Sequence, residues 1–137
     1  MANFTGTIED REEIRDLYAR YADTLDNHRY NEWLDLFTDD GSFESTRFGK
    51  HSGRAGLEKF TRVYRDSLGG AQARHVITNL LFRIEDDRAE GSCYLLYSHC
   101  KEGRVQQSTV ANYRDALRRV DGRWRFHSRK VCVDGRA

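Results

Sequence analysis

The residues best suited to proton transfer in this sequence are one aspartate, Asp26, and five histidines, His28, His51, His75, His99 and His127. Asp26 stands at the end of an amphipathic helical pattern, where the helix dipole makes a carboxylate unfavourable by a few tenths to about 1 kcal/mol. Asp26 is therefore either solvated and without consequence, or it is needed by a cationic group inside the fold. His75 differs from most of the other histidines because it lies within an extended segment.

His75 shares one side of its expected strand with Ile77, Asn79 and Leu81, a mostly apolar face. A single histidine on such a face is most often a hydrogen-bonded core residue. A carboxylate within reach changes that interpretation, because it fixes the tautomer of the imidazole and stabilises the protonated ring, as the partner of a catalytic base does. The sequence thus leads to the hypothesis that Asp26 and His75 form a pair, and the distance between them tests it.

The elements that must position these residues begin with a helical first half. Apolar residues at a 3.6-residue period predict a helix over residues 8–25 and a second helix that begins at Tyr30 and ends in the turn 38–41. Ser52 can cap a third helix, which ends at Gly69.

From residue 73 the period changes to two, and Asp86-Asp87 and Asp121-Gly122 mark tight turns between strands. Helices followed by successive hairpins predict a single α+β domain over residues 1–137, with the helices on one face of a curved sheet. Such a cone has an open mouth where a pocket can form.

The strand that begins at Ala73 has apolar residues on both faces. Strict alternation places Val76, Leu80, Phe82 and Ile84 on one face, and Ile77 and Leu81 on the other. One face can cover the helices, and the other needs a second cover. We therefore expect a homo-oligomer, a dimer or a trimer, that is joined through the outer face of the sheet.

Three stretches carry a family resemblance: IRDLYARYADTLDNHRYNEWLDLFTDDGSFE, ARHVITNLLFRIEDDRAEG and RRVDGRWRF. Together they resemble the SnoaL-like branch of the NTF2-like superfamily, and within it the scytalone dehydratase-like and dehydrochlorinase-like proteins. The resemblance implies a cone-shaped α+β barrel, with three N-terminal helices packed in a strongly curved, mostly antiparallel sheet. It also implies a catalytic pair at Asp26 and His75, since catalytic relatives pair an aspartate at the end of the first helix with a histidine early in the sheet.

Further site residues follow from the same resemblance. The second pocket histidine of scytalone dehydratase falls on His99, and an asparagine on its later strand falls on Tyr113. The two tyrosines with which that enzyme holds a water fall on Leu25 and Ser45, so departure of a hydroxyl group must be assisted differently, or another group leaves. Tyr21, Tyr113 and His99 are the candidates for an acid or a substrate-binding group. The positions expected to line the pocket are Tyr18, Leu25, Trp33, Ser45, Ile77 and Asn79.

The direction of His99 depends on a single residue of register. A two-residue turn at Asp86-Asp87 would pair His75 with Ser98 and turn His99 outward, whereas a longer loop or a bulge would bring His99 to the pocket side. Tyr18, Tyr21 and Trp33 also have a simpler interpretation as packed aromatic residues.

Composition limits the function classes. Lys plus Arg number 23 and Asp plus Glu number 22, which gives a net charge of +1 and argues against a nucleic-acid or membrane surface held by charge. The N-terminus lacks the pattern of a signal peptide, so we expect a cytoplasmic protein. The sequence contains no Gly-rich phosphate loop, serine elbow or zinc-type cysteine spacing. The arginines between Arg118 and Arg129 are expected on a solvated or interface face.

These observations lead us to expect a dehydratase-like lyase or isomerase that needs no cofactor and no metal. His75 would remove a carbon-bound proton from a small, hydrophobic, cyclic substrate while Asp26 holds the imidazole. Alternatives are a polyketide cyclase or ketosteroid isomerase-like enzyme, a non-catalytic small-molecule-binding protein, and a structural subunit like the small subunit of ring-hydroxylating dioxygenases. Fold alone does not decide between them.

Overall fold

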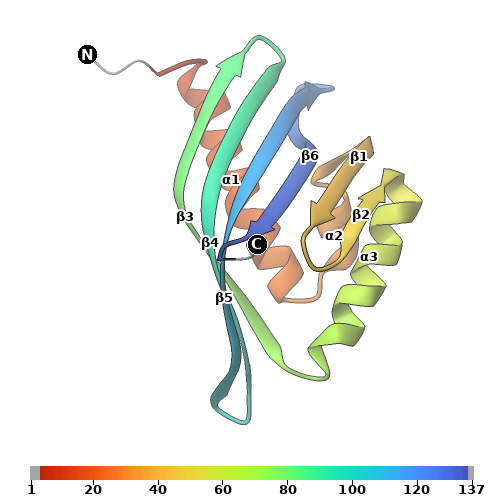
Figure 1. Cartoon of the computed structure of the whole chain (residues 1–137). Coiled ribbons are helices and arrows are strands. Elements are labelled where there is room, and N and C mark those ends of the chain that lie inside the picture. The colour runs from red at the N-terminus through yellow and green to blue at the C-terminus, as the bar shows by residue number, and fades with distance from the viewer. Residues whose placement is uncertain (1–3, 136–137) are drawn as a thin grey trace.

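The computed structural model describes residues 4–135, and it shows helices packed on one face of a curved sheet (Figure 1). In chain order the elements are α1 (Ile8–Asp26), α2 (Tyr30–Leu34), β1 (Phe37–Ser45), β2 (Gly49–Ser52), α3 (Gly53–Leu68), β3 (Gln72–Glu85), β4 (Arg88–Lys101), β5 (Arg104–Val120) and β6 (Arg123–Val133). The predicted α+β class, with helices against one face of a curved sheet, is confirmed.

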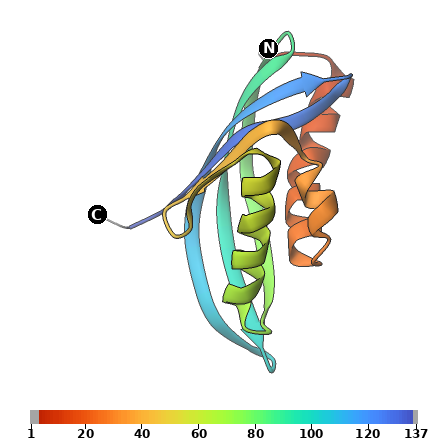
Figure 2. The same ribbon diagram turned by 90° about the vertical axis from the view of Figure 1, so that its right-hand side faces the viewer.

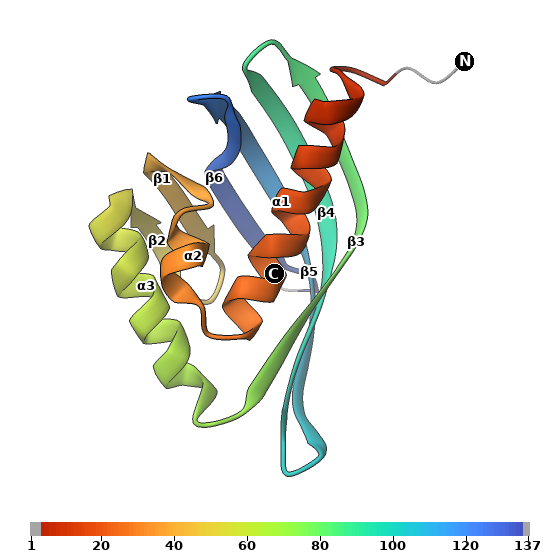
Figure 3. The same cartoon turned by 180° about the vertical axis from the view of Figure 1, so that it is seen from behind.

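The strands form one sheet in the order β2-β1-β6-β5-β4-β3. All neighbouring strands are antiparallel except β1 and β6, which are parallel. Seen from the side, the long strands bend around the helices (Figure 2). From behind, α1 lies in front of the long strands and α3 lies beside β1 and β2 (Figure 3). The space between the helices and the sheet is where a site can form.

Two of the helices follow the predicted pattern closely. The side chain of Thr7 accepts a hydrogen bond from the backbone N–H of Asp10 and caps α1. Gly69 ends α3 in a left-handed conformation with φ of 56°. The apolar residues that defined each helical stripe are buried, namely Ile14, Leu17, Tyr18, Tyr21 and Leu25 in α1 and Leu57, Phe60, Tyr64 and Leu68 in α3.

The predicted extent of the second helix is wrong. That helix ends at Leu34, and Phe37 already begins β1 instead of completing the apolar stripe of α2. The carbonyl of Leu36 accepts the backbone N–H of Phe126 at 2.8 Å, and Phe37 is paired with Phe126 in the parallel ladder. Pairing with the sheet therefore overrides the helical period over these residues.

A β-bulge in β3 changes which side chains face the helices. Thr78 is paired with Tyr94 and Leu81 with Ser92, so β3 carries one extra residue at Asn79, whose φ is 55°. Before the bulge Ile77 faces inward, and after it the inward residues are Leu80, Phe82 and Ile84. The strict alternation predicted for this strand is therefore wrong beyond Thr78.

A second bulge reverses the alternation in β6. Ser128 is paired with Ala116 but Phe126 with Leu117, which leaves His127 as the extra residue. Arg129 consequently faces inward like Phe126, and only 1% of its surface is exposed. The prediction that Arg129 lies on a solvated or interface face is wrong for this reason.

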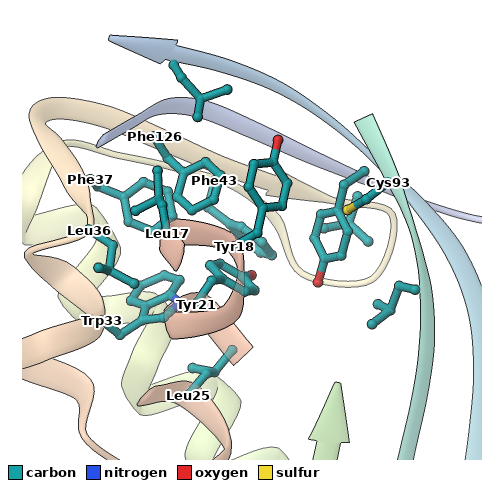
Figure 4. Packing of buried hydrophobic residues seen from close by; sticks show 14 of the residues in the cluster. Leu17, Tyr18, Tyr21, Leu25, Trp33, Leu36, Phe37, Phe43, Cys93 and Phe126 are labelled. Atoms are coloured by element: carbon teal, nitrogen blue, oxygen red, sulfur yellow. The ribbon is translucent and has the colours of Figure 1, made fainter. Parts of the chain in front are cut away.

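The core is dominated by aromatic side chains from α1, α2, β1 and β6. Figure 4 shows Tyr21, Trp33 and Phe37 packed together, and the ring centroids of Trp33 and Phe37 are 4.7 Å apart. Trp33 itself is fully buried. Among residues 4–135, no helix has both the length and the apolar character needed to cross a membrane.

Candidate active site

The last turn of α1 and the beginning of β3 bring Asp26 and His75 into direct contact. Nδ1 of His75 lies 2.5 Å from Oδ1 of Asp26, and the backbone N–H of His75 donates to Oδ2 at 2.9 Å. The side chain of Gln72 donates to the backbone carbonyl of Asp26 at 2.8 Å. Asp26 is thus held by groups of β3 at a helix end that carries no basic residue in its last turn.

The geometry of this pair sets the roles of the two imidazole nitrogens. A carboxylate only accepts hydrogen bonds, so Nδ1 of His75 carries the hydrogen and Nε2 is the nitrogen that can accept a proton. Each side chain is only 6% exposed, which strengthens the electrostatic contact relative to one in water. The structure therefore brings together the two residues that the sequence suggested as a pair.

His75 lies on the wall of a cavity between the helices and the concave face of the sheet. The volume of this cavity, measured as the space that the centre of a water-sized sphere can occupy, is about 110 Å³. Leu25 lines it from α1, Phe60 from α3 and Leu95 from β4, so most of the wall is apolar. Such a shape, apolar with a few polar groups, is typical of small-molecule sites.

Two tyrosines that the sequence suggested, Tyr21 and Tyr113, line the inner part of this cavity. Their ring centroids are 5.8 Å apart in an edge-to-face arrangement. Burial raises the pKa of Tyr21 to about 12 and raises the pKa of Tyr113 well above its usual value. Both hydroxyls therefore stay protonated at neutral pH and can donate a hydrogen bond.

A second pair of tyrosines, Tyr64 of α3 and Tyr97 of β4, lies on the same cavity and was not foreseen as part of the site. Their hydroxyl oxygens are 3.2 Å apart, and the ring of Tyr97 packs edge-on to His75 at 4.8 Å between centroids. Burial raises the pKa of both hydroxyls. The helical spacing of Tyr64 from Phe60 predicted only that it is buried, whereas the position of Tyr97 follows from the bulge in β3.

The remaining sequence-suggested residues divide between the cavity and the core. Ser45 and Leu25 line the cavity, as expected. Tyr18 lies behind the wall and donates a hydrogen bond to Asp115 at 2.6 Å, and Trp33 is enclosed by aromatic rings. These two are core residues, and their placement in the pocket lining is wrong.

Ile77 and Asn79 are not part of the cavity wall either. Ile77 is partly buried and packs against the core farther along β3. Asn79 is exposed, because it is the residue at the bulge, where the strand leaves its regular alternation. Its predicted position on the side of His75 is wrong for that reason.

The same bulge decides the direction of His99. It aligns His75 with Tyr97 and Ala73 with His99, so His99 lies on the concave side of the sheet. There, its Nε2 is hydrogen-bonded to Oε1 of Gln107 at 3.0 Å, and Gln107 rather than His99 lines the cavity. This arrangement favours contact between a ligand and Gln107 rather than between a ligand and His99.

The inner end of the cavity rests on a buried ionic cluster that sequence reasoning missed. The guanidinium of Arg129 bonds both carboxylate oxygens of Asp115 and lies 3.7 Å from the ring centroid of Tyr113 and 4.2 Å from that of Tyr21. Only the bulge in β6 places Arg129 there, and no sequence signal marks it. Within the described part of the chain, no group of three His, Cys, Asp or Glu side chains is arranged to hold a metal ion.

A known protein family covers most of this chain. A family model described as a SnoaL-like domain matches residues 6–130. The chain therefore belongs to the SnoaL-like family of the NTF2-like superfamily, which includes isomerases, dehydratases and cyclases. The resemblance seen in the sequence is confirmed. No match was found among the curated proteins.

Solved structures with this fold cover nearly the whole chain. An NTF2-like protein with a cystatin-like fold from Novosphingobium aromaticivorans is 29% identical, with a TM-score of 0.84 over 95% of this chain and 86% of that one. A protein from Catenulispora acidiphila in complex with S-DNPA is 26% identical, with a TM-score of 0.83 over 93% and 96% of the two chains. LinA, at 22% identity, has a TM-score of 0.80 over 93% and 87%, and shares the fold.

Proposed function

We propose that this protein is a cofactor-independent lyase or isomerase, in which His75 removes a carbon-bound proton from a small cyclic hydrophobic substrate. The observation that carries the proposal is the 2.5 Å contact between Nδ1 of His75 and Oδ1 of Asp26 on the wall of an apolar cavity. A base oriented by a carboxylate and facing a ligand-sized space is the arrangement that general-base catalysis needs.

The proton balance of the reaction follows from the side chains present. Nε2 of His75 takes the proton from carbon, and Asp26 stabilises the imidazolium that forms. The electron pair of the broken C–H bond then forms a C=C bond. At the same time either the bond to a leaving group breaks and that group departs with its bonding pair, or the π pair of a neighbouring carbonyl moves onto the carbonyl oxygen. A protonated tyrosine of the cavity, Tyr21, Tyr97 or Tyr113, can donate to that oxygen. If a group leaves, the enzyme is a dehydratase-like lyase, and if none leaves, it is an isomerase or a cyclase.

The substrate class follows from the wall of the cavity. The lining is mostly aromatic and aliphatic, so a ring with few polar groups would bury its surface well there. A structural relative that is 26% identical was solved in complex with S-DNPA, which supports the proposal that a protein of this fold binds a ligand.

Hydrogen–deuterium exchange into small cyclic ketones, followed by NMR in D₂O, tests the proposal. The native protein should speed exchange next to the carbonyl for at least one ketone of the panel, and elimination of water should be sought with the matching hydroxyketones. His75→Gln should lower the rate about 10²- to 10⁴-fold, the usual contribution of a positioned general base. His28→Gln, which changes an exposed histidine outside the cavity, should leave the rate unchanged.

The role of Asp26 has its own readout. In native protein the ¹⁵N shifts of the His75 ring should show hydrogen on Nδ1, and Asp26→Asn should change that tautomer population and slow the exchange. If no compound of the panel exchanges or eliminates faster with native protein than with His75→Gln, the enzymatic proposal fails. The alternative is then a binding protein of this fold, for which the cavity alone is sufficient.

A further inference from the structure

One charged side chain, Arg47, lies at the cavity and has no part in the chemistry described above. Arg47 belongs to the turn between β1 and β2, and its guanidinium lies 5.0 Å from the ring centroid of Phe48. Both residues line the cavity. Among the cavity-lining residues of the described chain, Arg47 alone carries a permanent charge.

The positive charge of Arg47 is not neutralised by an ion pair with any described residue. None of the ion pairs within residues 4–135 includes Arg47. The carboxylate of Asp26 is hydrogen-bonded to His75 and is not part of the cavity wall. A cation at the mouth of an apolar cavity, with no described carboxylate within ion-pairing distance, attracts an anionic group of a ligand.

The charge also reaches into the cavity. Burial raises the pKa of Tyr97, and the hydrogen bond with Tyr64 and the nearby guanidinium of Arg47 oppose that shift. Arg47 therefore lies close enough to act on the hydroxyl of Tyr97, the residue whose ring packs against His75. Gln107 and Thr109 of β5 add polar groups to the same wall, while Leu95 and its neighbours keep the rest apolar.

From this distribution of groups, we infer that the ligand of the cavity is a small cyclic carboxylate, with its ring among the aromatic walls and its carboxylate at Arg47. This inference rests on the proposed function only in placing the ligand in the same cavity. It narrows the substrate from a cyclic apolar molecule to a cyclic organic acid, because a guanidinium matches the planar geometry of a carboxylate with two donors.

The test compares benzoate with benzamide, which has the same ring and shape but no charge, and with acetate, which has the charge but no ring. Dissociation constants are measured by ¹H–¹⁵N NMR titration of the native protein and of Arg47→Gln, with Arg62→Gln as the control. Arg62 is exposed on α3, lies outside the cavity and loses the same charge on substitution. Arg47 is exposed too, so its substitution leaves the core intact.

Benzoate should bind the native protein about 3- to 10-fold more tightly than benzamide at low salt, and this advantage should shrink at about 0.15 M salt. Arg47→Gln should remove the advantage without changing the affinity for benzamide, and Arg62→Gln should leave it intact. Acetate should bind more weakly than either, because it buries no ring.

Several results would overturn the inference. Equal affinity of the native protein for benzoate and benzamide would do so. So would an equal loss of the benzoate advantage in Arg47→Gln and Arg62→Gln, or no binding of benzoate at all. Loss of the benzoate advantage in His75→Gln but not in Arg47→Gln would assign the anion to the imidazolium instead. Charge-selective binding through Arg47 without any proton exchange would leave this inference standing while the proposed enzymatic function fails.

Discussion

Arg129 and Asp115 form a two-point ion pair inside the core, with Nε to Oδ1 at 2.9 Å and Nη2 to Oδ2 at 3.2 Å, and neither side chain is exposed. Tyr18 adds a third hydrogen bond to the same carboxylate. Burial raises the pKa of Asp115, and the charge of the guanidinium opposes that shift. The pair fixes the position of the guanidinium against the tyrosine rings at the inner end of the cavity.

Breaking this pair should cost far more stability than breaking an exposed one. Asp115→Asn leaves the guanidinium buried without its counter-charge, so the free energy of unfolding should fall by about 3–5 kcal/mol. Asp35→Asn, which removes an exposed partner of Arg54, should cost at most about 1 kcal/mol. Denaturant unfolding followed by circular dichroism measures both. Equal losses in the two variants would show that the buried pair contributes no more than a surface contact.

Gly91 of β4 should not tolerate a side chain, because of Tyr18. A Cβ at this position would lie 2.3 Å from the hydroxyl oxygen of Tyr18, which is hydrogen-bonded to Asp115 and has little room to move. Gly91→Ala should therefore lower the free energy of unfolding by about 1–3 kcal/mol.

A double-mutant cycle identifies the cause of that loss. In a Tyr18→Phe background the clashing hydroxyl is gone, so Gly91→Ala should cost less than it does in the native protein. The same penalty in both backgrounds would mean that the hydroxyl is not what excludes a side chain at Gly91.

The buried tyrosines predict a loss of stability in alkali. Burial raises the pKa of Tyr21 in the folded protein to about 12, against about 10 in an unfolded chain. The folded state therefore keeps this proton longer. The contribution of this hydroxyl to the free energy of unfolding is fully present below about pH 10 and is lost as the pH rises towards 12.

Free energies of unfolding measured between about pH 8 and pH 12 should show a shallower decline for Tyr21→Phe than for the native protein. Tyr94→Phe is the matched control, since Tyr94 is 57% exposed on the other face of the sheet. An unchanged slope in Tyr21→Phe would contradict the assignment of the alkaline loss to this hydroxyl.

The outer face of the sheet predicts self-association. Val76, Leu96 and Val110 are paired across β3, β4 and β5, and 49%, 48% and 53% of their surfaces are exposed. A contiguous apolar row of this kind is typical of a protein interface, and a second copy of the chain is the occupant that we expect.

The mass of the native protein in solution, measured by light scattering after size-exclusion chromatography, should be that of a dimer or trimer. Leu96→Glu should shift it to the monomer, whereas Val63→Glu, at an exposed position of α3, should not. A monomeric native protein would contradict the prediction that the chain self-associates through the outer face of the sheet.

How far the sequence could predict the site depends on where the strands are regular. Asp26 and His75 were found because α1 keeps its helical period to the end and His75 precedes the first bulge of β3. The family resemblance supplied their roles as a hypothesis. Tyr97 and Arg129 were missed because their inward direction follows from bulges, which leave no reliable sequence pattern.

The fold class was easier to predict than individual strand faces. Alternation and helical period each extend over many residues, so a single irregularity does not hide the class of an element. The exception was the segment 35–41. Phe37 fits the helical stripe of the residues before it, but in the structure it belongs to β1 and is paired with Phe126 of β6.

The extra residue at Asn79 has a consequence for how the site can change. Deleting it would restore strict pairing along β3. Every side chain on one side of the deletion would then turn to the opposite face, which would affect either His75 before the bulge or Phe82 after it. Either His75 would leave the cavity or the core would lose an aromatic ring. The residues that line this cavity therefore depend on the number of residues in a strand as much as on their types, and deletions there should be tolerated less readily than substitutions.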